Sequence, residues 1–163
     1  MTESHTAIRE EVAKLCQQFP GDYWRAKDRD RAYPGEFVAA LTEAGYLAAL
    51  IPEEYGGSGL NLSAAAVILE EIHRQGCNAA ACHAQMYTMG TVLRHGSEAQ
   101  KAKYLPKLVS GEHVGSLAMS EAGAGSDVVS MKLKADSVQG GFVLNGTKFW
   151  ITNAPYADTL VVY

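Results

Sequence analysis

The sequence has little cysteine and no long hydrophobic segment. Its three cysteines, Cys16, Cys77 and Cys82, follow no metal-ligand spacing and are odd in number. This argues against a disulfide framework and favours a reducing compartment. The longest apolar runs, such as residues 46–51, are far shorter than the roughly 20 residues that cross a bilayer. We therefore expect no membrane as a partner.

Basic charge is also scarce, since 14 lysines and arginines stand against 18 aspartates and glutamates. A formal charge of −4 does not favour binding to nucleic acid, which needs clustered cations. The N-terminal segment carries Glu3, Arg9 and Glu10 where a secretory signal needs apolar residues. Its acidic residues are also atypical of a mitochondrial presequence, so the cytoplasm is the predicted location.

The motifs of several common site types are missing as well. A P-loop, a His-Glu-x-x-His zinc motif and a Gly-x-Ser-x-Gly elbow are absent. Gly123 and Gly125 begin a Rossmann-like pattern, but Val128 stands at its third glycine and a strand is predicted next. The five histidines follow no ligand spacing, so we expect no metal site.

The first two thirds of the chain have helical periodicity. With 163 residues, 47% of them apolar, the chain suffices for one domain or two small lobes. One apolar stripe recurs at steps of three and four: Ile8, Val12, Leu15 and Phe19. Further helices are predicted from Pro34 to Gly45, from an N-cap at Ser63, over residues 79–94, and from a capping box at Ser97 to Gly111. Glu70, Glu71 and Arg74 are predicted to form a solvated face with an i,i+4 pair.

After Gly111 the pattern becomes that of strands. Short segments between turn signals are predicted as strands: 114–119, 131–138, 141–144, 148–152 and 159–163. We therefore predict an α+β fold with two parts. An N-terminal all-helical bundle over residues 1–113 precedes an incomplete antiparallel β-barrel-like domain over residues 114–163. The last strand reaches Tyr163, so we expect an unfinished sheet and a fragment.

Two segments are candidates for a binding site. Residues 117–127 form a loop of small residues with Ser120 and Ser126 near its ends, which would let backbone N–H groups approach an anion. Trp150 and Thr152 stand two apart on a predicted strand, so their side chains would share one side of it. Composition alone also fits the commoner roles, which are a glycine-rich turn for the loop and a core or surface anchor for the tryptophan.

Longer motifs at these places carry a family resemblance. Residues 52–60, 119–127 and 144–148, followed by 150–153, resemble in order and spacing the N-terminal and part of the middle domain of acyl-CoA dehydrogenases. The isovaleryl-CoA dehydrogenase branch is the most similar. Two departures are Ala122, where the family often has proline, and Ala154-Pro155, where glycine is more usual.

The resemblance implies an FAD site. Its residues would be Leu117, Ala118, Met119, Ser120, Glu121, Ala122, Gly123, Ala124, Gly125, Ser126, Trp150, Ile151 and Thr152. Ser120 would hydrogen-bond the flavin ring, and Ser126 would also bind the CoA portion of the substrate. Trp150 would pack on the flavin, and Thr152 would hydrogen-bond near its N5 atom.

The reaction that the resemblance implies is α,β-dehydrogenation of a short or branched acyl-CoA, with an electron-transfer flavoprotein as acceptor and a homotetramer as the assembly. The family's base is a glutamate beyond Tyr163, so we assign no catalytic residue in this chain and expect the C-terminal helical domain to be absent. Were the chain active alone, Glu121 would be the first base to examine. The alternatives are an acyl-CoA oxidase or flavin monooxygenase of the same fold, or a non-catalytic fragment.

Overall fold

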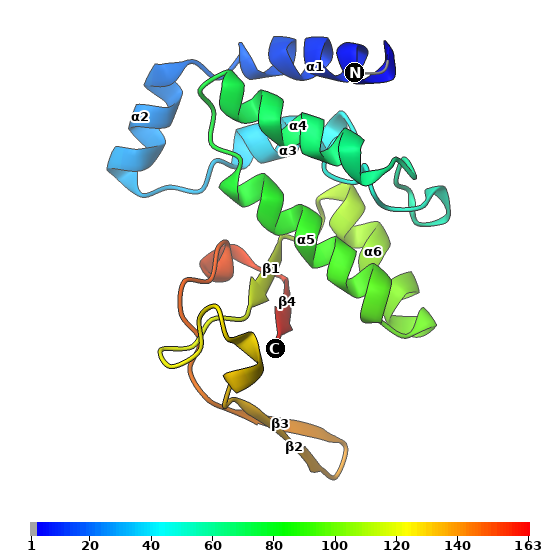
Figure 1. Cartoon of the computed structure of the whole chain (residues 1–163), viewed down its shortest axis with the longest axis vertical. Coiled ribbons are helices and arrows are strands. Elements are labelled where there is room, and N and C mark those ends of the chain that lie inside the picture. The colour runs from blue at the N-terminus through cyan, green and yellow to red at the C-terminus, as the bar shows by residue number, and fades with distance from the viewer. Residues whose placement is uncertain (1–2) are drawn as a thin grey trace.

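A computed structural model describes residues 3–163, and it places helices first and strands after them (Figure 1). The helices are α1 (Glu3–Cys16), α2 (Gly21–Asp30), α3 (Gly35–Glu43), α4 (Leu62–Arg74), α5 (Ala80–His95) and α6 (Glu98–Ser110). The strands are β1 (Gly115–Ala118), β2 (Lys134–Val138), β3 (Gly141–Asn145) and β4 (Thr159–Val162). Short 3₁₀ turns are η1 (Glu53–Tyr55), η2 (Val128–Ser130) and η3 (Ala154–Tyr156). The predicted α+β class, a helical lobe followed by a β part, is confirmed.

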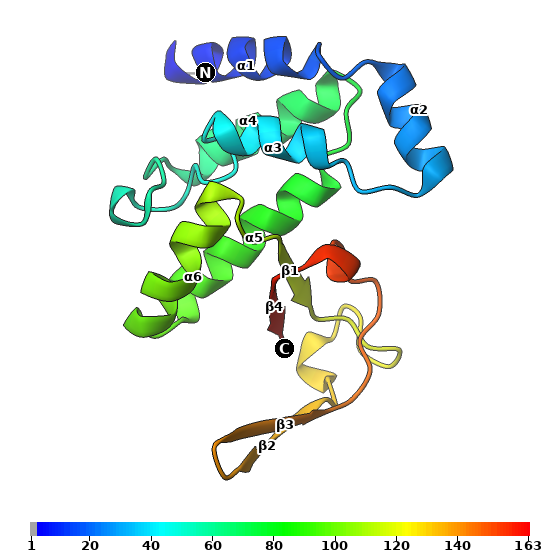
Figure 2. The ribbon, with the colours of Figure 1, turned by 180° about the vertical axis from the view of Figure 1, so that it is seen from behind.

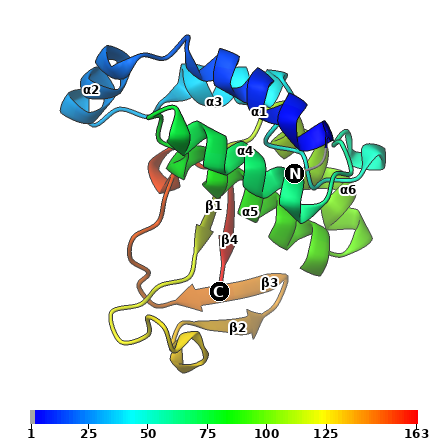
Figure 3. The ribbon, with the colours of Figure 1, turned by 45° about the horizontal axis from the view of Figure 1, so that its top comes forward.

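The helical lobe holds the main apolar core. The predicted stripe of the first helix lies on α1, where Val12 is completely buried, and α1 packs across α4 (Figure 3). Phe19 lies beyond the end of α1 but still packs against this core. Fully buried large side chains come from the other helices: Phe37, Leu41, Ile68, Met89 and Leu105. These residues belong to the apolar core, whose burial stabilises the fold.

Two helices, α4 and α6, begin at residues whose side chains cap them. The capping box predicted at Ser97 is present, because its hydroxyl accepts from the Gln100 N–H and its own N–H donates to the Gln100 side chain. The N-cap predicted at Ser63 is wrong. Asn61 caps α4 by accepting from the Ala64 N–H, and the Ser63 hydroxyl donates to the Asn61 side chain instead. Asparagine is as good an N-cap as serine, so the helix begins earlier.

The predicted solvated face on α4 is wrong for Glu71. This residue is only 2% exposed, and its carboxylate faces the guanidinium of Arg9 on α1 at 3.3 Å and that of Arg74 at 3.6 Å. Burial alone would raise the pKa of Glu71, but hydrogen bonds from Gln75 and Arg9 outweigh it and hold the pKa below its ordinary value. The pair ties the first helix to the fourth, whereas Glu70 stays largely exposed and also pairs with Arg9.

The strands form two separate pairs (Figure 2). β2 and β3 make the expected antiparallel hairpin, with Lys134 opposite Asn145. β1 and β4 pair in parallel, with Gly115 opposite Thr159, which corrects the expectation of an all-antiparallel arrangement. Parallel pairing requires a long crossover, and residues 119–158 supply it. The strand predicted over 148–152 is also wrong, since these residues form no ladder.

The three thiols are free and buried. Burial raises the pKa of Cys82 to about 12, so this thiol stays protonated and unreactive near neutral pH. Among residues 3–163 no helix combines the length and apolar character that crossing a membrane requires.

Candidate functional site

The two candidate segments lie side by side and run in opposite directions. The Phe149 N–H donates to the backbone oxygen of Ser120 at 2.9 Å. The Ser116 hydroxyl donates to the backbone oxygen of Thr152 at 2.6 Å. Ser116 comes four residues before Ser120, whereas Thr152 comes three residues after Phe149, so the two segments are antiparallel. Ser116 is completely buried, so the contact is protected from water. The fold therefore brings together the two stretches that the sequence marked as one site.

The loop that follows β1 makes a tight turn with an open outer side. Glu121 and Ala124 exchange backbone hydrogen bonds of 3.3 and 3.2 Å, which places Ala122 and Gly123 at the tip. A Cβ atom added at Gly123 or Gly125 would meet no atom of the chain within 4 Å. The chain itself thus leaves the approach to this backbone clear, as a nest for an anionic group requires.

The carboxylate of Glu121 accepts hydrogen bonds from three donors and is not free. The Lys148 ammonium lies 2.8 Å from its Oε1 atom, and the backbone N–H groups of Lys132 and Leu133 donate to the same carboxylate at 2.7 and 2.9 Å. The Lys148 hydrogen bond and those two backbone donors lower the pKa of Glu121 to about 2. A carboxylate with that pKa is a poor proton acceptor near neutral pH, so Glu121 is not suited to act as a base.

Trp150 has an unusual backbone and a nearly free side chain. Its φ angle is 58°, in the left-handed region that bulky residues rarely adopt, and it is 92% exposed. Because residues 148–152 are not a strand, the predicted reason for Trp150 and Thr152 to share a side does not hold. Strained backbone of this kind is concentrated at functional sites, and an exposed indole offers a flat apolar surface.

Thr152 instead borders a cavity between the two parts of the molecule. The cavity has a volume of about 520 Å³. Its walls come from α2, the start of α5 and the segment after Trp150, and include Trp24, Lys27, Tyr33, Ala81, Thr152 and Tyr156. Thr152, two residues after the exposed Trp150, therefore lines a space large enough for part of an organic ligand.

The other predicted residues divide by position. Leu117 and Ala118 belong to β1, and Ser126 is exposed beyond the turn. Sequence reasoning missed the residues that join the segments, namely Ser116, Lys148 and Asn153. Asn153, buried and with a φ angle of 67°, donates to the backbone oxygens of Ala81 and Gly115. Two features of the sequence could have pointed to Asn153: it directly follows Thr152, and asparagine tolerates the left-handed backbone conformation better than most residues.

Comparisons with known proteins agree with this organisation. Residues 2–112 match the acyl-CoA dehydrogenase N-terminal domain, and residues 116–163 match the acyl-CoA dehydrogenase middle domain. A mitochondrial isovaleryl-CoA dehydrogenase of Pongo abelii is 43% identical over 173 residues, which cover 100% of this chain and 40% of the relative. The chain therefore spans well under half the length of that enzyme.

Solved structures show the same fold. A glutaryl-coenzyme A dehydrogenase in complex with glutaryl-CoA matches with a TM-score of 0.87 and 34% identity, covering 99% of this chain and 42% of that one. The FAD complex of PigA matches with a TM-score of 0.89 and 26% identity, covering 99% and 43%. Since the two domain models together span nearly every residue, the chain belongs to the acyl-CoA dehydrogenase family.

Proposed function

We propose that the protein catalyses FAD-dependent α,β-dehydrogenation of a short or branched acyl-CoA thioester. The observation that carries the proposal is the antiparallel contact between residues 115–121 and 148–153. It sets a small-residue loop with an open approach beside an exposed indole on strained backbone. The first feature suits a phosphate group and the second an aromatic ring system. A flavin dinucleotide contains both.

The residues present fit such a cofactor. We assign the backbone and hydroxyl groups of residues 117–126 to the flavin and its pyrophosphate, Trp150 to packing on the ring, and the Thr152 hydroxyl to a hydrogen bond with it. FAD, when bound, supplies the acceptor for the hydride of the substrate. The protein's part is to bind, to orient and to exclude water. Ser126, exposed beside the loop, is assigned to the CoA portion of the substrate.

The proton that leaves the α-carbon needs a base, and we assign no residue of this chain to that role. Glu121 lies inside the loop, but its carboxylate is paired with Lys148 and its pKa is about 2. The pairing suits a carboxylate that shapes a site rather than one that accepts a proton.

The relatives guide the substrate and partner assignments. One is named for isovaleryl-CoA and another was solved with glutaryl-CoA, so we propose a short acyl chain and favour a branched one. We further propose an electron-transfer flavoprotein as acceptor, a homotetramer, and a division of the chain into domains after residue 113. The cytoplasm remains our proposed compartment, although the Pongo abelii relative is mitochondrial by name.

The proposal is tested by anaerobic titration of the FAD-loaded complete gene product with isovaleryl-, butyryl-, glutaryl- and octanoyl-CoA. Bleaching of the flavin band by isovaleryl-CoA is the expected result. Thr152→Ala should slow this reduction more than it weakens acyl-CoA binding, because the lost hydrogen bond serves the ring. No bleaching with any thioester would refute the proposal. Rapid reoxidation of the bleached flavin by oxygen would point instead to an acyl-CoA oxidase.

A further inference from the structure

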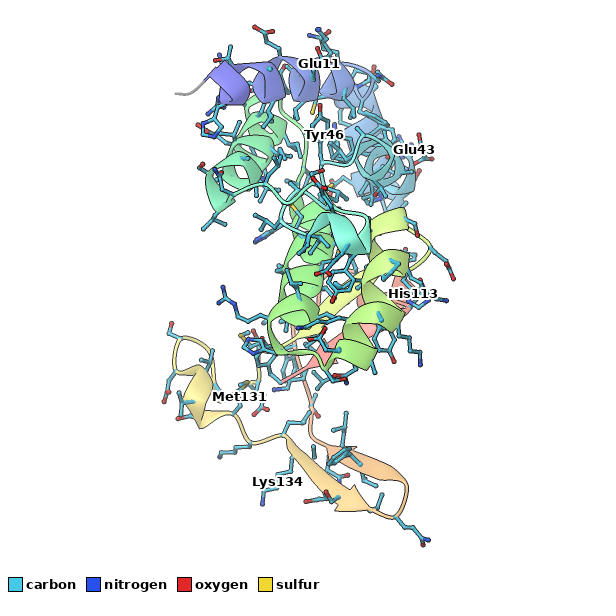
Figure 4. All side chains as sticks on the ribbon, turned by 90° about the vertical axis from the view of Figure 1, so that its right-hand side faces the viewer. Glu11, Glu43, Tyr46, His113, Met131 and Lys134 are labelled. Carbon is cyan, nitrogen blue, oxygen red and sulfur yellow. The ribbon has the colours of Figure 1, made fainter. Side chains whose placement is uncertain are left out.

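The ammonium group of Lys148 contacts three places in residues 119–133, the segment that we call the flavin loop because it contains most of the proposed flavin-binding residues. The Nζ atom of Lys148 donates to the backbone oxygen of Met119 and to the carboxylate of Glu121, both at 2.8 Å. It also lies 3.3 Å from the sulfur of Met131, at the far end of the loop. Figure 4 places Met131 between the helices and the hairpin that begins at Lys134. The Lys148 and Glu121 side chains are only 7% and 10% exposed.

The carboxylate of Glu121 closes the loop from the other side. Its two oxygens accept the N–H groups of Lys132 and Leu133, which lie 11 and 12 residues further along the chain. Hydrogen bonds to a charged acceptor are about twice as strong as neutral ones. The hydrogen bonds from Lys132 and Leu133 to Glu121 thus close residues 121–133 into a loop, and the ion pair with Lys148 holds the carboxylate that closes it.

The loop has few other fastenings. Apart from the contact with Lys148, the hydrogen bonds found within residues 122–131 join residues three apart, such as Ser130 with Asp127 and Met131 with Val128. Neither Glu121 nor Lys148 belongs to the apolar core of the helical lobe. The shape of the loop therefore depends on this pair more than the stability of the whole fold does.

We propose that Glu121 and Lys148 are positioning residues, which fix residues 119–133 against residues 148–153 so that the flavin enters a preformed site. Lys148 precedes Trp150 by two residues, so the same ammonium that fixes the loop also anchors the segment that carries the indole. The inference rests on the proposed flavin site, but it assigns the pair a role in shaping that site and none in contacting the flavin or reacting atoms.

The first arm of the test uses FAD-free complete gene product and limited trypsin digestion. Both Glu121→Gln and Lys148→Met should speed cleavage after Lys132 by about 10-fold or more. Glu121→Gln removes the charged acceptor of the Lys132 and Leu133 N–H groups, and Lys148→Met removes the cation that holds this acceptor in place. Glu112→Gln is the matched control, since it removes an exposed carboxylate that pairs with Lys107. Unchanged cleavage after Lys132 in both site variants would overturn the proposal.

The second arm measures the Kd for FAD by quenching of flavin fluorescence. Glu121→Gln and Lys148→Met should weaken binding by about 10-fold or more, and Lys148→Arg, which keeps the charge, should recover most of it. Equal FAD affinity in all variants, with faster cleavage, would overturn the positioning role, because the pair would then be merely structural. Circular dichroism of the helical lobe verifies folding, and a poorly folded Lys148→Met leaves Lys148→Arg and Glu121→Gln to decide.

The two arms separate this inference from the proposed function. Wild-type protein that fails to bind FAD would contradict the flavin site itself. The trypsin arm, which needs no FAD, would then still decide whether the pair fixes the loop.

Discussion

The side-chain amide of Asn153 donates a 3.1 Å hydrogen bond to the backbone oxygen of Ala81, 72 residues earlier in the chain. Ala81 lies in the first turns of α5, and Asn153 follows the segment with the exposed indole. The same amide donates to the backbone oxygen of Gly115 in β1 at 3.2 Å. One buried side chain thus joins the helical lobe, the sheet and the candidate site.

This junction predicts unequal effects of two small substitutions. Asn153→Gly keeps a residue that tolerates the φ angle of 67° but loses both hydrogen bonds, and should lower the free energy of unfolding by about 1–3 kcal/mol. Asn153→Ala loses the same bonds and adds left-handed strain, so it should cost about 1 kcal/mol more. Urea unfolding measures both. An alanine variant as stable as the glycine variant would contradict the conformational part of the argument.

The two neighbouring glutamates on α4 should respond differently to the loss of charge. Glu71 is buried against Arg9, whose side chain is only 17% exposed, so Glu71→Gln leaves a largely buried cation without one of its two carboxylate partners and should destabilise the protein by about 2–4 kcal/mol. Glu70 pairs with Arg9 at the surface, and Glu70→Gln should cost less than about 1 kcal/mol. Thermal unfolding of the two variants side by side is the measurement. Equal destabilisation by the two substitutions would show that the burial of Glu71 does not increase its contribution to stability.

Acid should weaken the hydrogen bonds and ion pair that hold residues 121–133, and the pH range in which this happens follows from the pKa of Glu121. The pKa of Glu121 is about 2 in the folded chain and about 4.3 in an unfolded one, where the carboxyl is free. A carboxyl group whose pKa is lower in the folded state contributes to the free energy of unfolding. This contribution is fully present above about pH 4.5 and is lost as the pH falls through about 2. The difference in unfolding free energy between wild type and Glu121→Gln should therefore stay constant from pH 7 to 5 and shrink from pH 4.5 to 3. A difference that grows over the lower range would contradict the assigned pKa.

Helices with an apolar stripe and a capping pattern could be predicted from the sequence, and α6 with its capping box is the clearest case. The helix α2 was not predicted. Six of its ten residues are charged and none is buried, so it has no apolar stripe to reveal it. Its partly buried Tyr23 and Trp24 pack on the core only because the chain folds back beside Phe37.

The two segments of the candidate site could be predicted from the sequence, but the path of the backbone through the second segment could not. The loop and the segment around Trp150 were both marked by their residue types, and the fold brings them together as expected. Residues 148–152 were wrongly predicted to form a strand, because the sequence pattern of a strand is a local signal. Their actual path is set by distant partners, Ser116 for the Thr152 carbonyl and Ala81 for the Asn153 amide.

The central claim is that residues 117–126 and 148–153 hold a flavin, and Gly125→Val tests it most directly. A Cβ atom added at this position meets nothing in the chain within 4 Å, so we expect the variant to unfold at the same temperature as wild type. Gly141→Val, at an equally open glycine in the β2–β3 hairpin, is the matched control. The measurement is the FAD content of each complete gene product after purification, from absorbance of the flavin released on denaturation.

Wild type and Gly141→Val should carry stoichiometric FAD, whereas Gly125→Val should be folded and largely colourless, because only the bound cofactor would crowd its side chain. A folded Gly125→Val protein with stoichiometric FAD would contradict the account and reduce the loop to a simple turn.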